Sequence, residues 1–532
     1  MRLLALAAAV VALVVPLLAQ QRLPGTASLE GTVIHDGSGR PLPRTRLALK
    51  KLEAKEAETT VTGEDGKFRF ENLGAGVYTL TASRTGYLAT STVQADKRNT
   101  QSITIWRMGQ QVTDLTVRLK PGGVIAGKVR YRDGEPAIGV PVQIFYRADV
   151  RGRRSYRPVG TTTTNDLGEY RLHSLAPGSY YVMAHLEAAD TGDRKDELPP
   201  EQAVTTFYPS GTQFANATAV RVAPAGEVTG CDIALAQSRT YIVSGRIVSG
   251  QSGKTISTPG VLLRWMDGTQ SGTVAAVQAI SNKGSFRAAG VTPGTYLIVI
   301  ESSEEGRRLS ARQTVTVTDT ALDLEILAGP ARKWTGSVRF DQRADFDISA
   351  LRVRLEPRSD TASPLVVNLS AEGTFDAELV PDETYDVFIE NAPADVYLKS
   401  AVVAGAETIA TGFKVPRAAD VRKMELTAAV QGGSVSGQAH TLDGGAASTA
   451  FVFLLPQPLE GRVQYVASSI SDDSGNFVVR GVAPGRYLAV AWPSDTWCSP
   501  YDTESPPDCT LGGQPVSISQ GDISGIQIRT VR

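Results

Sequence analysis

Few residues in this chain could support catalysis or hold a metal, and their spacing does not bring them together. A catalytic zinc ion needs two His and a Glu that converge on one metal with an open position. The His residues lack HxxE or HExxH spacing, and no CxxC pair is present. They are His35, His173, His185 and His440. We therefore predict no enzyme activity, no metal site and no cofactor.

Acidic residues gather in three short turns, "GEDG", "TNDLG" and "SDDSG", which raises the question of calcium. A calcium ion takes six to eight oxygen ligands, usually from several carboxylates. Each of these turns offers one or two carboxylates, which is too few. Asp and Asn are favoured in turns for their own backbone hydrogen bonds, so we assign these residues a turn role.

Aromatic residues outside any repeated pattern are the candidates for binding carbohydrate, because sugar sites commonly present a flat ring with polar neighbours. The densest cluster is "AWPSDTWCSPYDTE", residues 491–504. It supplies the candidates Trp492, Trp497 and Tyr501, and Trp106 and Trp265 stand apart from it. The alternative is that these large amphipathic rings cover an edge of a folded domain.

The Cys residues indicate one local disulfide. Cys498 and Cys509 flank the Pro-rich stretch "SPYDTESPPD", and we predict that they pair in an oxidising compartment. Two unrelated free thiols are the alternative. Cys231 is left over from an odd count, and its place in "VTGCDIALA" predicts a small buried apolar residue.

A basic cluster occupies "YRADVRGRRSYRP", residues 146–158. Its Arg residues could meet an anionic polymer, but the solvated tip of a hairpin is the commoner explanation. The cluster comprises Arg147, Arg151, Arg153, Arg154 and Arg157.

Net charge and the first residues bound the compartment and the partners. Lys plus Arg nearly balance Asp plus Glu, and the formal net charge is −1, so we expect no nucleic acid partner. Residues 1–19 combine one basic residue with the apolar run "LLALAAAVVALVVPLLA", which is typical of a secretory signal peptide. An uncleaved membrane anchor is the alternative, and no later segment is apolar enough to span a membrane.

The chain repeats one pattern five times, and this pattern must carry the fold. In "NDLGEYRLHSLAPGSYYVMA", residues 165–184, a Gly is followed at a fixed spacing by an aromatic residue and then by a Tyr. A short alternating run containing a Gly, such as "IAGKV", precedes each copy. The repeated triplets are Gly66, Phe68, Tyr78; Gly168, Tyr170, Tyr180; Gly284, Phe286, Tyr296; Gly373, Phe375, Tyr385; and Gly475, Phe477, Tyr487.

The constant residues describe a core and a turn. Tyr170 and Leu172 alternate along one strand and Tyr180 and Val182 along the next, which places them on one face. Between the strands, "PG" suits a type II turn. We predict an all-β tandem array of five small antiparallel β-sandwiches with about seven strands each. The ranges are 24–120, 121–237, 238–328, 329–428 and 429–532.

The combination "D-x-G-x-F/Y" followed by "L-x-P-G-x-Y-x-V/L" resembles the carboxypeptidase regulatory-like domain, a transthyretin-like (prealbumin-like) β-sandwich in the carbohydrate-binding-like group. The resemblance implies an accessory domain and not a peptidase. Copy three lacks the acidic turn residue. Copy four departs further, with Glu383 in place of the turn Gly and Pro381 one place early, so we expect a type I turn there.

Pilin-like sandwiches locked by isopeptide bonds are a second family with a similar pattern. In that family a catalytic Glu lies four residues after the Tyr, and this chain has no carboxylate there, so we predict no isopeptide bonds. The corresponding residues are Ala82, Ala184, Ile300, Ile389 and Ala491.

These observations favour a secreted, non-enzymatic β-sandwich protein of a bacterial cell envelope, in the periplasm or outside it. We expect an elongated monomer without an integral membrane segment after signal cleavage. Polysaccharide or envelope proteins are the expected partners. The alternatives are a purely structural spacer, a protein scaffold, or an accessory subunit of an envelope enzyme or transporter.

Overall fold

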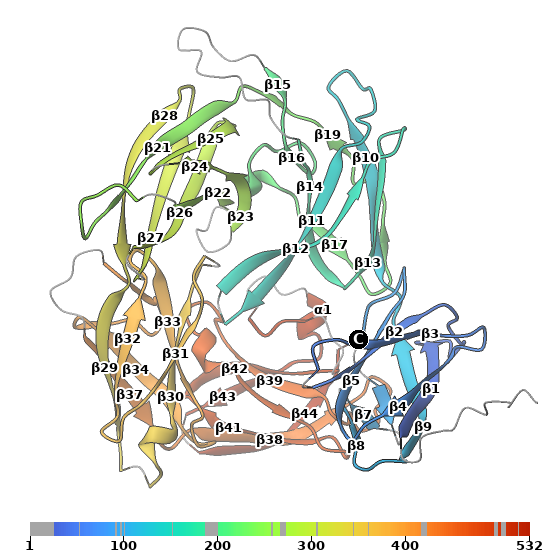
Figure 1. Cartoon of the computed structure of the whole chain (residues 1–532). Helices are drawn as coiled ribbons and strands as arrows, with labels where there is room; N and C mark the ends of the chain where they lie inside the picture. Colours follow the sequence, from blue (N-terminus) through green and yellow to red (C-terminus); the bar gives the residue numbers. More distant parts are fainter. Residues whose placement is uncertain are drawn as a thin grey trace, which may run out of the picture. The chain divides into compact units, whose positions relative to one another are not determined.

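The structure is a computed structural model, and almost all of its regular elements are β-strands (Figure 1). It describes residues 26–531 except 53, 91–92, 96–97, 101, 152, 187–200, 257–258, 267–272, 283, 305–306, 344, 360, 417–422, 494–497, 502–506 and 520. The predicted signal peptide, residues 1–19, and Trp497 lie outside the described residues. Residues up to Gly122, with His173–Leu175, form one compact unit, and the rest of the chain forms a second.

The first sandwich shows how the sequence pattern becomes structure. In β4 the side chains of Phe68 and Phe70 are buried and their neighbours Lys67 and Arg69 are exposed, as a period of two requires. Two sheets, β4-β1-β9-β6-β7 and β3-β2-β5-β8, enclose the core. The strands are β1 (Ala27–His35), β2 (Arg46–Lys51), β3 (Glu58–Val61), β4 (Lys67–Leu73), β5 (Gly76–Ser83), β6 (Val93–Ala95), β7 (Arg98–Thr100), β8 (Ile103–Ile105) and β9 (Gln111–Leu119).

The second sandwich has a long hairpin, β11–β12, in its second sheet. Its main sheets are β13-β10-β18 and β12-β11-β14-β16. The elements are β10 (Gly123–Arg130), β11 (Pro141–Val150), β12 (Arg153–Thr163), β13 (Glu169–Leu175), β14 (Gly178–Ala184), β15 (Gln202–Ala203), β16 (Thr206–Phe207), the 3-10 helix η1 (Phe214–Asn216), β17 (Val220–Val222), β18 (Glu227–Val228), β19 (Ile233–Ala234) and β20 (Gln237–Ser238).

In the third sandwich the two sheets run into each other. Pairing of Leu309 with Pro330 and of Ser310 with Gly329 joins β27 to β28, which gives one eight-stranded path, β23-β22-β26-β27-β28-β21-β25-β24. The strands are β21 (Tyr241–Ser249), β22 (Gly260–Met266), β23 (Thr273–Gln278), β24 (Ile280–Asn282), β25 (Ser285–Val291), β26 (Gly294–Glu304), β27 (Arg307–Val317) and β28 (Leu322–Pro330).

The fourth sandwich returns to two separate sheets, β32-β29-β37-β34-β35 and β31-β30-β33-β36. Its elements are β29 (Arg332–Phe340), the 3-10 helix η2 (Ile348–Ala350), β30 (Arg352–Pro357), β31 (Leu365–Asn368), β32 (Thr374–Leu379), β33 (Thr384–Glu390), β34 (Tyr397–Val403), β35 (Ala406–Glu407), β36 (Phe413–Lys414) and β37 (Lys423–Ala429).

The fifth sandwich contains the one short α-helix among the described residues, α1 (Pro507–Thr510). Its sheets are β41-β38-β44 and β40-β39-β42-β43. The other elements are β38 (Gly433–His440), β39 (Phe451–Pro456), the 3-10 helix η3 (Val463–Tyr465), β40 (Ala467–Ile470), β41 (Asn476–Val482), β42 (Gly485–Trp492), β43 (Gln514–Ile518) and β44 (Asp522–Arg529).

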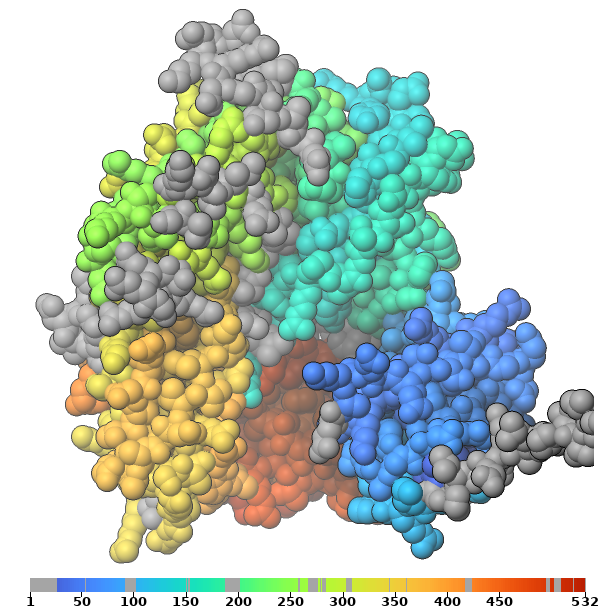
Figure 2. Space-filling model, in the orientation of Figure 1, coloured from blue at the N-terminus to red at the C-terminus, as the bar shows by residue number. Residues whose placement is uncertain are grey.

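One pairing scheme recurs in all five sandwiches, which confirms the all-β tandem fold. The strand of the Gly-aromatic motif and the last long strand flank the first strand, as in β4-β1-β9 and β41-β38-β44. Buried apolar side chains form the cores between the sheets, and Figure 2 shows one outer face of the chain, coloured along the sequence. Each sheet takes its strands from a single sandwich.

Each sandwich also contains a parallel pair of strands, which the sequence pattern did not indicate. The first strand of each sandwich runs parallel to a strand near the end of that sandwich, as β1 does to β9 and β38 to β44. Alternation along a strand fixes which face is buried, but it carries no information on the direction of the neighbouring strand. The equivalent parallel pairs in the other sandwiches are β10 with β18 and β19, β21 with β28, and β29 with β37.

This parallel neighbour explains the Gly in the first strand of each repeat. A Cβ added to Gly437 would lie 2.0 Å from the carbonyl oxygen of Ile526 on β44, so only Gly allows the strands to approach. Gly31 and Gly245 meet β9 and β28 in the same way, and Gly127 meets the carbonyl oxygen of Cys231, between β18 and β19. In the fourth sandwich, the ring of Phe375 instead occupies the space beside Gly336.

The turn predictions are also corrected. Gly178 and its counterparts have φ near 150°, not the value near +80° of a type II turn. In the fourth sandwich, Pro381 is followed by Asp382 with φ of 65°, and the backbone N–H of Glu383 donates to Val380 O. Positive φ after Pro is the signature of a type II turn, so the type I prediction is wrong there.

Candidate functional site

The repeated residues form the core and turns of the sandwiches and no exposed site. The aromatic and Tyr side chains of all five triplets are buried. The five motif glycines, Gly66, Gly168, Gly284, Gly373 and Gly475, all have φ between 71° and 82°. At Gly475 an added Cβ would lie 2.4 Å from Ala439 O, so this position requires Gly for its backbone and for space.

The hydroxyl of the repeated Tyr has a role that the sequence pattern did not reveal. Tyr487 donates its O–H to the carbonyl oxygen of Ala483 at 2.7 Å, and Tyr78 and Tyr296 bond in the same way to Gly74 and Thr292. This hydrogen bond ties the second strand to the turn that precedes it. Tyr180 makes the equivalent bond to Ala176.

The fourth sandwich replaces this bond, as its altered turn requires. There the hydroxyl of Tyr385 accepts a hydrogen bond from the backbone N–H of Val380 at 3.3 Å. Burial raises the pKa of both Tyr385 and Tyr487 to about 12, so both hydroxyls are neutral near pH 7.

Tyr170 is the one Tyr at the aromatic position of the motif, and its extra hydroxyl has a partner. It donates to the carbonyl oxygen of Cys231. Cys231 itself is a free, buried thiol, and burial raises its pKa. The predicted role of Cys231 as a small buried residue therefore agrees with its position.

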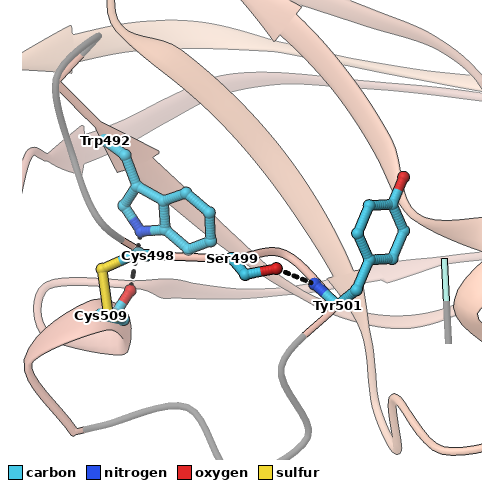
Figure 3. Close-up of a disulfide and its surroundings, with 5 residues drawn as sticks. All are labelled: Trp492, Cys498, Ser499, Tyr501 and Cys509. Atoms are coloured by element: carbon cyan, nitrogen blue, oxygen red, sulfur yellow. Dashed lines mark hydrogen bonds between the residues drawn. A yellow bond between two sulfur atoms is a disulfide. The ribbon is translucent and has the colours of Figure 1, made fainter. Parts of the chain in front are cut away.

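The loop after β42 contains a disulfide between Cys498 and Cys509, as predicted (Figure 3). Trp492 is 1% exposed, and its Nε1 donates to the carbonyl oxygen of Cys509 at 2.8 Å. Its ring packs with Leu455 and Val531 in a small apolar cluster. In this position the ring offers no face to a sugar.

Tyr501 points away from Trp492, so the two rings share no flat surface (Figure 3). Burial raises the pKa of Tyr501, although the charge of Arg151 and a hydrogen bond with it act in the opposite direction. Arg151 belongs to the tip of the β11–β12 hairpin in the second sandwich. Tyr501 thus lies against the second sandwich, and not over an edge of its own domain as the sequence alternative proposed.

The basic hairpin is neither a solvated tip nor an open cationic surface. Arg147 Nε lies 3.0 Å from Asp149 Oδ2, and both side chains are less than 10% exposed. Arg154 Nε lies 3.4 Å from the same carboxylate. Because the guanidinium groups of Arg147 and Arg154 are already paired, these two residues have little free charge to offer an anionic polymer.

The second and third sandwiches share one apolar cluster. Phe207 and Phe214 of the second contact each other, and the ring of Phe207 lies 5.0 Å from that of Trp265 in the third. Gln213 Nε2 also donates to the hydroxyl of Tyr296 at 3.0 Å. Trp265, one of the candidate sugar-binding rings, is buried in this joint.

The third and fourth sandwiches meet through a buried ion pair. Arg312 Nε of β27 lies 3.6 Å from Glu383 Oε2, and the side chains are 7% and 3% exposed. Arg312 also donates to Thr361 Oγ1 and to the backbone oxygen of Thr361, at 2.8 and 2.7 Å. Glu383, the residue that departs from the repeat pattern, therefore stabilises the contact between these two sandwiches.

Trp106 is exposed, unlike the candidate rings of Trp265 and Trp492. It follows β8 in the first sandwich, and its side chain is 81% exposed. Its backbone N–H donates to Gln110 Oε1 at 2.8 Å, which holds the short loop together. A large exposed ring beside an amide group is the arrangement that the carbohydrate prediction sought at Trp492.

No other arrangement of reactive groups emerges from the part of the chain that is described. Within it, no group of three or more His, Cys, Asp or Glu side chains is placed to hold a metal ion. No helix in that part is long and apolar enough to cross a membrane. A polar pocket of about 560 Å³ in the fourth sandwich is lined by Thr335, Asn368 and Asp376 among others, without a Trp or Tyr.

Fold and repeated core together define a tandem β-sandwich protein. Residues 28–106, within the first sandwich, match the family model of the carboxypeptidase regulatory-like domain. The other four sandwiches share its pairing scheme. No curated protein matches the chain.

Several solved structures are similar to parts of the chain. A streptococcal ancillary pilin is 12% identical, with a TM-score of 0.19, over 57% of this chain and 99% of the pilin. The shaft pilin SpaA from Lactobacillus rhamnosus GG is 12% identical, with a TM-score of 0.21, over 40% and 98%. The Bacillus anthracis TIE protein is 10% identical, with a TM-score of 0.16, over 73% and 68%. TM-scores this low carry no inference about function.

Proposed function

We propose that this protein is an exported, non-enzymatic structural module of the cell envelope, which spaces or presents surfaces for other envelope components. One observation carries the proposal: every residue that the five copies hold constant lies in the core or in a turn. Repetition has preserved a folded unit and not a reactive site. The apolar start of the chain supports export.

The joints support a scaffold more than a chain of independent beads. Within the second unit, the hairpin of the second sandwich contacts the fourth and the fifth, which are not its neighbours in sequence. A scaffold of this kind holds binding surfaces at fixed positions.

Cell fractionation tests this proposal. The full chain should be recovered from the envelope or the periplasm, and a variant that lacks residues 1–19 should stay in the cytoplasm. Crosslinking in the native cell should then recover envelope proteins or polysaccharide with the full chain. Recovery of the full chain from the cytoplasm, or turnover of a substrate by the purified protein, would contradict the proposal.

Carbohydrate binding is a second candidate, and the exposed ring of Trp106 is the observation that favours it. On a glycan array, retention should be lost in a Trp106→Ala variant and kept in a Leu52→Ala variant, because Leu52 is also exposed in the first sandwich. Equal retention of both variants, or no retention of the parent, would exclude this site.

A further inference from the structure

Glu356 is buried although its side chain lies on the face of β30 that points away from the core. In β30 the side chains of Val353 and Leu355 face the core of the fourth sandwich, so Glu356 belongs to the opposite face. It is nevertheless only 1% exposed. A charged side chain that points away from the core and is still shielded from water must be covered by another part of the chain.

Arg151, at the tip of the β11–β12 hairpin, is part of that cover. Its Nη1 donates to Glu390 Oε1 at 2.7 Å, and its guanidinium lies 5.3 Å from the ring centroid of Phe388. Both residues are on β33, next to β30. Burial lowers the pKa of Arg151, but the hydrogen bond to Glu390 and the charges of Glu390, Tyr501 and Glu356 outweigh it, so the pKa is raised.

The surface around Arg151 combines the groups that recognise a guanidinium. Carboxylates accept its N–H groups, and an aromatic face attracts its charge. Arg354 helps to hold the carboxylates in place, because its Nε donates to Glu356 Oε2 at 2.7 Å and its Nη1 lies 3.7 Å from Glu390 Oε1. A Lys ammonium would lack the planar fork that fits this arrangement.

The disulfide loop of the fifth sandwich closes the arrangement from its other side. Ser499 Oγ donates to the backbone oxygen of Asp149 at 2.9 Å, and Tyr501 hydrogen-bonds with Arg151. Ser499 directly follows Cys498, whose bond to Cys509 closes the loop. The loop is therefore held where its two polar side chains meet the hairpin.

We propose that Phe388 and Glu390 form a guanidinium-binding surface that Arg151 of the same chain occupies, that Glu356 flanks this surface through Arg354, and that the Cys498–Cys509 loop retains Arg151 there. The second, fourth and fifth sandwiches are then joined at one point. Disulfide formation completes the joint: two thiols lose two protons and two electrons to a disulfide donor, which is reduced to its dithiol. The proposal does not rest on the envelope role.

Hydrogen exchange of the full chain tests this, with Arg151→Ala as the main variant. Its matched control is Arg157→Ala, because Arg157 is exposed on the same hairpin. Hairpin amides between residues 146 and 157 should exchange about tenfold faster in Arg151→Ala, since a hydrogen bond to a charged group is lost. They should be unchanged in Arg157→Ala. Equal rates in the two variants would overturn the proposal.

A double-mutant cycle tests whether the Cys498–Cys509 loop retains Arg151. Cys498→Ala with Cys509→Ala should also speed exchange of the hairpin, and adding Arg151→Ala should cause little further change, because both act on one joint. Additive effects would show that the loop does not retain Arg151. Should the β38–β44 amides lose protection in the Cys variant, Tyr501→Phe replaces it, and unchanged hairpin exchange in that variant would equally count against the loop.

Discussion

The carboxylate of Glu383 lies 3.6 Å from the guanidinium of Arg312, and both side chains are hidden from water between the third and fourth sandwiches. Glu383 stands where the other repeats have the turn Gly. The residue that departs from the repeat pattern is thus the residue through which the fourth sandwich contacts the third. Ser359 Oγ also donates to Glu383, which adds a fixed donor to this carboxylate.

Replacing Glu383 by Gln should therefore destabilise the joint. Arg312 would remain buried without its counter-ion, and breaking a buried pair in this way costs about 3 kcal/mol. Native-state hydrogen exchange of β27 and β33 measures the loss separately from the other sandwiches. As a control, Glu227→Gln removes the partner of Arg171 in an exposed pair and should change little. Equal effects of both changes would contradict the assignment.

Gly475 and Gly444 form a matched pair in the fifth sandwich. Both have positive φ, but an added Cβ meets Ala439 O at 2.4 Å only at Gly475, and nothing within 4 Å at Gly444. Gly444→Ala should cost about 1 kcal/mol for the backbone alone, and Gly475→Ala at least about 3 kcal/mol. Denaturant unfolding followed at the fifth sandwich checks this. A similar loss at both positions would show that space is not the cause.

Truncation should lower the stability of the protein at Trp492 and leave it nearly unchanged at Trp106. Trp492→Ala empties a buried site and should cost about 3 to 5 kcal/mol, whereas Trp106→Ala should stay within about 0.5 kcal/mol. Thermal unfolding of the two variants provides the comparison. A neutral Trp492→Ala variant would mean that the ring is not part of the core.

Buried tyrosines predict a loss of stability at alkaline pH. The pKa of Tyr487 is raised to about 12, above the ordinary value near 10, so its contribution is complete below pH 10 and is lost as pH rises towards 12. The loss is roughly 2 to 3 kcal/mol. Tyr487→Phe lacks this ionisation, so its stability deficit at pH 7 should shrink by pH 12 in calorimetric scans. A deficit that stays constant would contradict the assignment.

The sequence pattern was sufficient for the strands, the repeat and the core, because alternation and turn residues are local signals. Phe68, Tyr170 and Tyr487 lie in the core as their spacing predicts. The Cys498–Cys509 disulfide was also within reach, since both residues flank one short loop.

The contacts between sandwiches could not be predicted in this way. Nothing near Arg151 in the sequence indicates that Glu390 and Tyr501 will surround it, because such pairs are brought together only by the arrangement of whole domains. Glu383 could have been recognised from the sequence. A charged residue at a turn position that otherwise holds Gly is locally unfavourable, so it indicates that a contact with a neighbouring domain compensates for it. That signal identifies a joint but not its partner.

The parallel pairing of first and last strands has a mechanical consequence. The chain enters each sandwich at one end of the strands and leaves it at the opposite end, as the registers of β1 with β9 and of β38 with β44 show. A force that pulls on the two ends of a sandwich therefore acts along these strands. It loads the hydrogen bonds between them together, in shear, instead of opening them one after another.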